Sequence, residues 1–187
     1  MELRPYQQAN IEQIATLVRA GARRILYRAA TGSGKTVLAA KMIERVRDKG
    51  NSALFMAHRR ELIIQASEKL EAFGIRSGTI MAGFRHSLTN PIQVASIQTL
   101  HVRAVVKEKY GLPECDLLIV DECHRSLGKT YQDIIRAYPK AVVLGLTATP
   151  ARSDGRGLGH IYQAMVEAPS ERELTKLGFL GPVRHFV

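Results

Sequence analysis

The chain has 187 residues, of which 45% are hydrophobic, and its 27 Lys and Arg residues against 17 Asp and Glu residues give a net charge of +10. An apolar fraction of this size supports one folded domain and excludes a disordered tail. No run approaches the roughly 18 consecutive apolar residues of a membrane span, and the first residues lack the apolar stretch of a secretory signal, so we expect a cytoplasmic protein with no membrane partner.

Short apolar runs alternate with helical patterns along the chain. The first helix is predicted to begin at Pro5, which suits a first turn, and to stop at Gly21. Strands are predicted at residues 25–28, 53–57, 92–95, 117–120 and 141–146. Helices are predicted at residues 36–47, 61–73 and 131–137, with a further one near residues 170–177. Because the strands are apolar on both faces, the pattern predicts an α/β fold with a mostly parallel central sheet and helices on both faces.

Polar clusters follow the predicted strands at the points where those strands end. They lie at residues 31–36, 58–61, 96–99, 121–122 and 147–149. In a parallel sheet the carboxyl ends of the strands meet at one edge, and ligands bind there. The sequence therefore predicts one functional edge that collects all of these clusters.

Residues 29–36, AATGSGKT, match the phosphate-binding loop pattern G-x-x-x-x-G-K-[ST], except that Ala29 replaces the first glycine. Gly32 and Gly34 let backbone N–H groups curl around a triphosphate, and the following helix directs its positive dipole end at the same anion. Lys35 is expected to reach the β and γ phosphates, and the Thr36 hydroxyl suits Mg²⁺. A glycine-rich turn that only caps a helix is the alternative. The residues expected to bind ATP in this loop are Thr31, Gly32, Ser33, Gly34, Lys35 and Thr36.

The apolar strand predicted at residues 117–120 ends in Asp121 and Glu122. Asp121 is expected to hold Mg²⁺ through water, and Glu122 to orient and deprotonate the water that attacks ATP. Acidic pairs after strands also serve as plain helix caps. Beside a phosphate loop, however, the pair predicts catalysis by Lys35, Asp121 and Glu122, with Thr36 and Asp121 as the metal-holding residues.

These motifs resemble those of the first RecA-like motor domain of superfamily 2 helicases of the DExH-box group, and the chain is similar to the motor domain of type III restriction subunits. Residues 121–124, DECH, resemble the DExH box, and residues 4–7, RPYQ, resemble the Q motif. The resemblance implies a RecA-like P-loop NTPase fold, and it implies that Arg4 and Gln7 contact adenine. A Gln amide offers a donor and an acceptor to an adenine edge. A surface Gln in a helix begun by Pro5 is the alternative.

Two further motifs resemble family segments that contact nucleic acid, motif Ia at residues 57–62 and motif Ib at residues 96–100. Arg59 and Arg60 begin a predicted helix, where cations oppose the dipole, which indicates a phosphate nearby. Solvation of these arginines beside Glu61 is one alternative, and helix capping explains the Ser and Thr of motif Ib almost as well. The resemblance implies nucleic-acid contacts by His58, Arg59, Arg60, Ser96, Gln98 and Thr99.

The charge is distributed unevenly, with +8 over residues 1–93 and +2 over residues 94–187. A basic excess favours a polyanionic partner, with solubility alone as the alternative. The strand predicted at 141–146 ends in Thr147 and Thr149, which resemble motif III. In the family this motif links the nucleotide to the nucleic-acid site, and His124 by analogy takes part in the same coupling.

The resemblance divides the chain into a RecA-like ATP-binding domain at residues 1–150 and an extension at 151–187 that leads toward a second RecA-like domain. Nothing in the sequence matches the motifs of that second domain, which supplies arginines to the transferred phosphate in such helicases. An arginine supplied in trans is worth about a thousandfold or more in rate, so we expect weak ATP hydrolysis by this chain alone.

The leading hypothesis is an ATP-dependent helicase or translocase whose first motor domain binds Mg-ATP and single-stranded nucleic acid. Single-stranded DNA is the first expectation for the partner, with RNA as a second. One alternative is the duplex-DNA translocase motor of a restriction or repair enzyme. The other is a nucleic-acid-binding module without turnover.

Overall fold

A computed structural model describes residues 3–84, 88–106, 111–125, 128–149 and 158–181. The described strands are β1 (Arg24–Arg28), β2 (Ala53–Ala57), β3 (Gly78–Ile80), β4 (Ile92–Ser96), β5 (Leu117–Val120), β6 (Val142–Thr147) and β7 (Ala164–Glu167). The α-helices are α1 (Pro5–Arg19), α2 (Lys35–Arg47), α3 (Arg60–Ala72), α4 (Ile97–Leu100), α5 (Lys129–Ala137) and α6 (Glu171–Lys176). A π-helix at His101–Val106 continues α4, and a 3-10 turn covers Cys123–Arg125.

The strands form one sheet in the order β3-β4-β2-β5-β6-β1-β7, and every pairing among them is parallel. The predicted α/β fold with a parallel central sheet is therefore confirmed. Parallel strands need crossover connections, which here are mostly helical, and such sheets have both faces covered.

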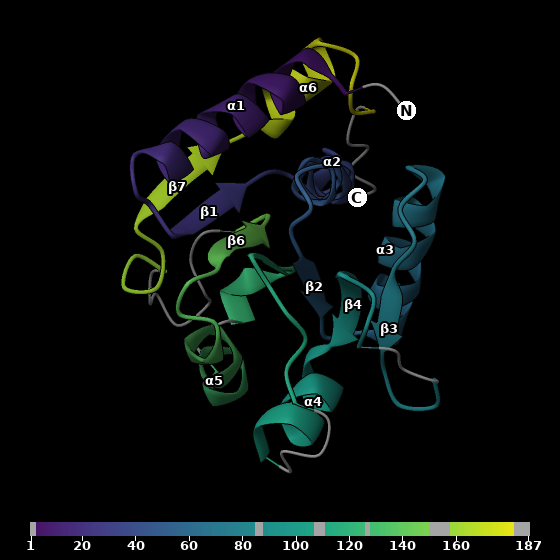
Figure 1. Ribbon diagram of the computed structural model, residues 1–187. Coiled ribbons are helices and arrows are strands. Elements are labelled where there is room, and N and C mark those ends of the chain that lie inside the picture. The colour runs from purple at the N-terminus through teal and green to yellow at the C-terminus, as the bar shows by residue number, and fades with distance from the viewer. Residues whose placement is uncertain (1–2, 85–87, 107–110, 126–127, 150–157, 182–187) are drawn as a thin grey trace, which may run out of the picture.

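Alternate residues of the central strands enter the two hydrophobic layers. On β5, Leu117 and Ile119 pack with buried residues of α1, α2 and α3, whereas Leu118 and Val120 pack with buried residues of α4 and α5. Figure 1 shows the two groups of helices on either side of the sheet. This alternation explains why the strand is apolar at every position, because both of its faces are buried.

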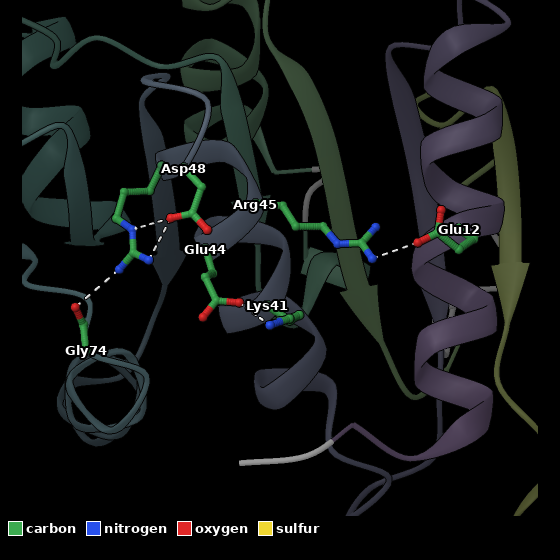
Figure 2. A network of polar contacts seen from close by, with 7 residues as sticks. Glu12, Lys41, Glu44, Arg45, Asp48 and Gly74 are labelled. Atoms are coloured by element: carbon green, nitrogen blue, oxygen red, sulfur yellow. Dashed lines mark hydrogen bonds and ion pairs between the residues drawn. The ribbon is translucent and has the colours of Figure 1, made fainter.

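Exposed polar contacts join α2 to its neighbours on the first of these layers. Arg45 on α2 bonds to Glu12 on α1 at 2.6 Å. Arg47 bonds both to Asp48 and to the carbonyl of Gly74, beyond α3 (Figure 2). Solvent-exposed pairs of this kind contribute at most about 1 kcal/mol each, so the buried layers carry the stability.

Two strands were absent from the sequence prediction, and both lie at edges of the sheet. β3 pairs only with β4, and β7 pairs only with β1. The predicted domain boundary at residue 150 lies outside the described residues. Beyond it, β7 joins the sheet by pairing with β1, and α6 follows β7. Each helix in the described part of the chain is too short or too polar to traverse a bilayer.

A glycine in β6 supplies the first testable prediction. A Cβ added to Gly145 would lie 2.5 Å from Cζ of the buried Tyr162 ring. We expect Gly145→Ala to lower the free energy of unfolding by about 1–3 kcal/mol, as overpacking of a core does. Urea denaturation measures the change. Gly159→Ala is the matched control, because no heavy atom lies within 4 Å of its added Cβ; an equal loss in both variants would contradict the prediction.

Candidate functional site

The strand register brings the carboxyl ends of the strands, where the predicted polar clusters begin, to one side of the sheet. We call this side the carboxyl edge. Arg28, the last residue of β1, is level with Thr147 of β6, and Val120 of β5 is level with Gly145 of β6. Farther along the sheet, Ala57 of β2 is level with Ser96 of β4. The phosphate loop, the acidic pair and the Thr147 segment follow three adjacent strands, β1, β5 and β6. The motif Ia and Ib segments follow β2 and β4.

The phosphate loop at residues 29–36 connects β1 to α2. The Ala29 N–H donates to the Thr147 carbonyl at 2.9 Å, which extends the β1–β6 ladder by one residue. Ala29 is buried, so alanine is accommodated at the position of the first glycine of the pattern. Gly32 and Gly34 have φ of 78° and 87°, in the left-handed region that glycine adopts without strain. The loop therefore has the glycines where its backbone requires them.

Lys35 begins α2, and its ammonium group donates to the carbonyls of Ala29 and Ala30 at 2.9 and 3.2 Å. Burial lowers the Lys35 pKa, while the negative charges of Glu122 and Asp121 oppose that shift. The lysine is thus partly withdrawn from water and lies in the field of the acidic pair. An anion that enters the loop meets a partly desolvated cation, for which charge interactions are stronger than in bulk water.

The segment at residues 4–7, which we call the Q region, packs directly on the phosphate loop. The Gln7 amide donates to the carbonyls of Ser33 and Gly34 at 3.2 and 3.4 Å, and its oxygen accepts from the Arg4 N–H at 2.9 Å. Gln7 is 2% exposed. The Tyr6 hydroxyl also donates to the Ser33 carbonyl. The alternative of a surface Gln7 is excluded, because this side chain is buried and its amide joins the start of α1 to the phosphate loop.

Gly34 is the closest point of this contact. A Cβ at Gly34 would lie 2.5 Å from the Gln7 amide nitrogen. Glycine is therefore needed here both for the positive φ and for the close approach of Gln7. The two motifs, far apart in sequence, form one packed unit.

Asp121 and Glu122 lie beyond β5, and their backbone is held in a tight turn. The Asp121 N–H donates to the Met56 carbonyl, and the Asp121 carboxylate accepts from the Glu122 N–H at 3.0 Å. Burial and the neighbouring Glu122 charge raise the Asp121 pKa to about 6. Glu122 has a φ of 49°, the one positive value among non-glycine residues of the described chain. A left-handed conformation costs roughly 1–2 kcal/mol for such a residue, so the turn is held against strain.

His124 lies next to this pair. Its Nδ1 is 3.1 Å from a Glu122 carboxylate oxygen, within ion-pairing distance although not in hydrogen-bond geometry. Thr147 accepts from the Thr149 N–H at 3.1 Å and donates to the Thr149 carbonyl at 2.7 Å. Thr147 is fully buried and Thr149 is exposed. The Thr147 hydroxyl therefore fixes the turn after β6, and Thr149 is the threonine of the pair that can meet a ligand.

The donor atoms at this end of the edge fit a magnesium nucleotide. The Ser33 hydroxyl is buried in the phosphate loop and has no hydrogen-bond partner. Thr36 offers a hydroxyl and Asp121 a carboxylate, the oxygen ligands that Mg²⁺ prefers. No cluster of three or more His, Cys, Asp or Glu side chains able to hold a metal occurs among the described residues. A metal ion here would thus be held by the Thr36 hydroxyl, the Asp121 carboxylate, water and the phosphates, a ligand set that is usual for Mg²⁺.

The motif Ia residues lie at the start of α3. Arg59 is the N-cap residue of this helix and Arg60 its first residue, and both are exposed, whereas His58 is half-buried. The Arg60 guanidinium lies 5.3 Å from the centre of the Phe84 ring. Phe84 is 40% exposed. The structure therefore adds an exposed aromatic ring that the sequence analysis missed, beside two exposed cations.

The motif Ib residues play more than one part. Ser96 is buried, and its hydroxyl caps α4 by accepting from the Thr99 N–H at 3.5 Å. Its hydroxyl also donates to the Gln98 side chain at 3.1 Å. Gln98 is exposed and Thr99 half-buried. The capping alternative thus holds for Ser96, and Gln98 is the residue of the three with an accessible side chain.

Comparisons with known proteins find a matching family and several similar chains. The model of a family described as "Type III restriction enzyme, res subunit" matches residues 1–152. The chain is 33% identical over 180 residues to the putative ATP-dependent helicase IRC3 of Saccharomyces cerevisiae, covering 88% of this chain and 26% of that protein. It is 30% identical over 190 residues to the type I restriction enzyme EcoAI endonuclease subunit of Escherichia coli, covering 97% and 23%.

A solved structure shares the fold. A nuclease-deletion mutant of the Type ISP restriction-modification enzyme LlaGI, in complex with a DNA substrate mimic, superimposes with a TM-score of 0.75 at 20% identity. The alignment covers 96% of this chain and 21% of that one. The chain therefore spans about a quarter of the length of the curated relatives described above.

The raised pKa of Asp121 generates a prediction about stability. A carboxyl whose pKa rises from 3.8 to about 6 on folding destabilises the folded chain progressively as pH increases from about 4 through 6. We expect Asp121→Asn, which removes the charge, to unfold with a free energy about 1–3 kcal/mol higher than wild type at pH 8, and equal to it below pH 4. Urea denaturation with EDTA and without nucleotide measures both values.

Asp48→Asn is the control for this experiment, since the Asp48 side chain is 58% exposed. It should show no gain in stability at pH 8. If Asp121→Asn proves no more stable than wild type at pH 8, the charged Asp121 carboxylate does not destabilise the folded chain, and the prediction is refuted.

Proposed function

The chain belongs to the family of the type III restriction enzyme res subunit, and from that membership we propose that it is an ATP-driven motor domain of a nucleic-acid translocase or helicase. The observation that carries the proposal is the carboxyl edge. It has a phosphate loop and an acidic pair on β1 and β5, next to a basic helix start that follows β2. Curated relatives are described as an ATP-dependent helicase and as a restriction endonuclease subunit, which supports the same class.

The residues divide the work of ATP hydrolysis in the following way. The phosphate loop binds the triphosphate through its backbone N–H groups, the ammonium group of Lys35 and the positive end of α2. Thr36 and Asp121 hold Mg²⁺, which neutralises charge on the phosphates. Glu122 orients the attacking water and accepts its proton. Its negative charge acts on the pKa of Lys35, which supports a shared site.

The nucleic-acid part of the proposal rests on the exposed Arg59, Arg60 and Gln98, with His58 beside them. None of these groups reads a base edge in an obvious pattern, so we propose contact mainly through phosphates, with little sequence preference. A single strand is the proposed partner. Duplex DNA is the second candidate, favoured by the likeness to restriction subunits, and RNA is a third.

A complete motor requires a second RecA-like domain, which we propose lies in a part of the protein outside this sequence. The relatives are about four times longer than the matched segment, which supports this division of labour. Without an arginine from such a partner, the transition-state charge lacks a stabilising cation worth about a thousandfold or more. The proposal therefore includes weak turnover by this chain alone.

Lys35→Ala and Glu122→Gln test the assignment of roles. We expect Lys35→Ala to weaken Mg-ATP binding at least about tenfold, since a hydrogen bond to a charged group contributes about 1.5–3 kcal/mol. Glu122→Gln should bind Mg-ATP as wild type does and lose about 100-fold or more in turnover, the contribution of a general base. Calorimetry measures the binding, and phosphate release measures the turnover. Equal loss of Mg-ATP binding in both variants would refute the assignment of binding to Lys35 and of water activation to Glu122.

The phosphate-release assay also identifies the nucleic-acid partner. Turnover is measured with no nucleic acid, single-stranded DNA, RNA and duplex DNA, for this chain and for a longer protein that includes the second domain. Stimulation by one polymer names the substrate class. If the wild-type chain binds no Mg-ATP in calorimetry, the proposal that it is an ATP-hydrolysing enzyme fails. A nucleic-acid-binding module without turnover is then the remaining hypothesis.

Arg59→Ala combined with Arg60→Ala tests the basic helix start. Loss of two phosphate contacts should weaken single-strand binding and make the slope of log affinity against log salt less steep by about 1.4. The control removes two cations at exposed positions far from the carboxyl edge, Arg136→Ala with Lys140→Ala. Fluorescence anisotropy at several salt concentrations measures both. An identical slope in wild type and the Arg59/Arg60 variant would show that these arginines are only solvated.

A further inference from the structure

The segment after α6 packs beside the phosphate loop and the Q region, at one end of the carboxyl edge. The Arg4 guanidinium lies over the Phe179 ring, 5.0 Å from its centre, and the Tyr6 ring lies 5.8 Å from it at an interplanar angle of 57°. The next residue reaches the phosphate loop itself, because a Cβ at Gly32 would lie 3.2 Å from Cδ2 of Leu180. Residues from the start of α1 and from the segment after α6 therefore meet beside the glycines of the loop.

This segment is fixed by hydrogen bonds at the end of α6. Gly178 has a φ of 73°, and the N–H groups of Phe179 and Leu180 both donate to the Leu174 carbonyl, at 2.8 and 3.2 Å. A glycine in this conformation with such bonds is the usual C-terminal cap of a helix. Leu174 is fully buried, and Ser170 caps the other end of the helix. Phe179 is thus held in place by the folded core.

The Q region connects the ring to the loop through a continuous set of contacts. Arg4 donates to the Tyr6 hydroxyl at 3.3 Å, and Tyr6 donates in turn to the Ser33 carbonyl. The Gln7 amide nitrogen donates to two carbonyls of the loop, and its oxygen accepts from the Arg4 N–H. Little of its hydrogen-bonding capacity is left for a base edge. A flat cation and a half-buried aromatic ring are what this surface offers to a neighbouring ligand.

On the basis of the proposed function, we propose that Phe179 contacts the nucleotide base, and that the adenine of ATP stacks on the surface made by Phe179 and Arg4. A triphosphate in the loop has its ribose and base attached, and these must lie against a neighbouring surface. The Arg4–Phe179 surface adjoins the loop through the neighbouring Leu180 and Tyr6, and it has the planar, apolar and cationic character that stacks with purines. Gln7 then acts as a positioning residue for the loop.

Two features favour a fixed wall over a ring that blocks the site. Displacing Phe179 would break the two bonds to the Leu174 carbonyl and disturb a helix end whose core residue is fully buried. The ring is also only half-buried, so part of it remains available for contact. A blocking ring would instead need a segment that moves away at low cost.

Calorimetry with Mg-ATP and with Mg-tripolyphosphate, which lacks the base and ribose, tests the proposal on the whole chain. We expect Phe179→Ala to weaken Mg-ATP binding about tenfold, within the range measured for loss of base–aromatic stacking, and to leave tripolyphosphate binding unchanged. Phe179→Tyr should bind both ligands as wild type does. Leu177→Ala is the matched control, since Leu177 is an exposed apolar residue at the same helix end.

Phe179→Leu accompanies these variants in case removal of the whole side chain disturbs the fold. It keeps apolar volume and removes the ring, so it should lose Mg-ATP affinity while its thermal unfolding stays close to that of wild type. Equal weakening of ATP and tripolyphosphate would overturn the proposal, because it would indicate a distorted loop. Tighter ATP binding would also overturn it and identify Phe179 as a blocking ring.

The outcomes separate this inference from the proposed function. If wild type binds neither ligand, the proposed ATP site fails and the base contact fails with it. If wild type binds both and the Phe179 variants bind Mg-ATP equally well, the ATP site stands and the base contact alone is refuted.

Discussion

The parallel pairing of β1, β5 and β6 is the constraint on which the site depends. The ends of these strands lie within two residues of one another in the register, so groups from distant parts of the sequence meet at one edge of the sheet. The Ala29 N–H donates to the Thr147 carbonyl and so extends the β1–β6 ladder by one residue. The first residue of the phosphate loop is therefore held by the sheet. The sheet therefore fixes the start of the loop, and the glycines fix its path.

Placing a lysine and two carboxylates at such an edge works against stability. Burial lowers the Lys35 pKa and raises that of Asp121, so both groups are less favourably charged than they would be in water. The positive φ of Glu122 adds backbone strain to the same turn. These costs are confined to the carboxyl edge, while the hydrophobic layers on both faces of the sheet offset them. Shifted pKa values of this kind cluster at functional sites, which fits the magnesium-nucleotide site proposed above.

Sequence reasoning succeeded where a pattern has a local cause. The five predicted strands lie within one residue of their observed bounds, because each is a predominantly apolar run with side chains buried on both faces. β3 and β7 were missed because edge strands are partly exposed and have no such run; in β7 only Val166 is buried. The grouping of the phosphate loop with Asp121 and Glu122 was also predictable, since it follows from parallel strands alone.

The contacts around the Q region were beyond that reasoning, because they join segments that no sequence period connects. The start of α1 lies against the phosphate loop through Gln7 and against the segment after α6 through Arg4, and Phe179 is separated from Arg4 by nearly the whole described chain. The first and last described parts of the chain thus share one surface beside Gly32 and Gly34. The segment beyond β7, which the sequence analysis assigned to an extension, thus lies beside the phosphate loop. Its N–H groups at Phe179 and Leu180 bond to the carbonyl of the buried Leu174, so α6 and its cap join this segment to the folded core.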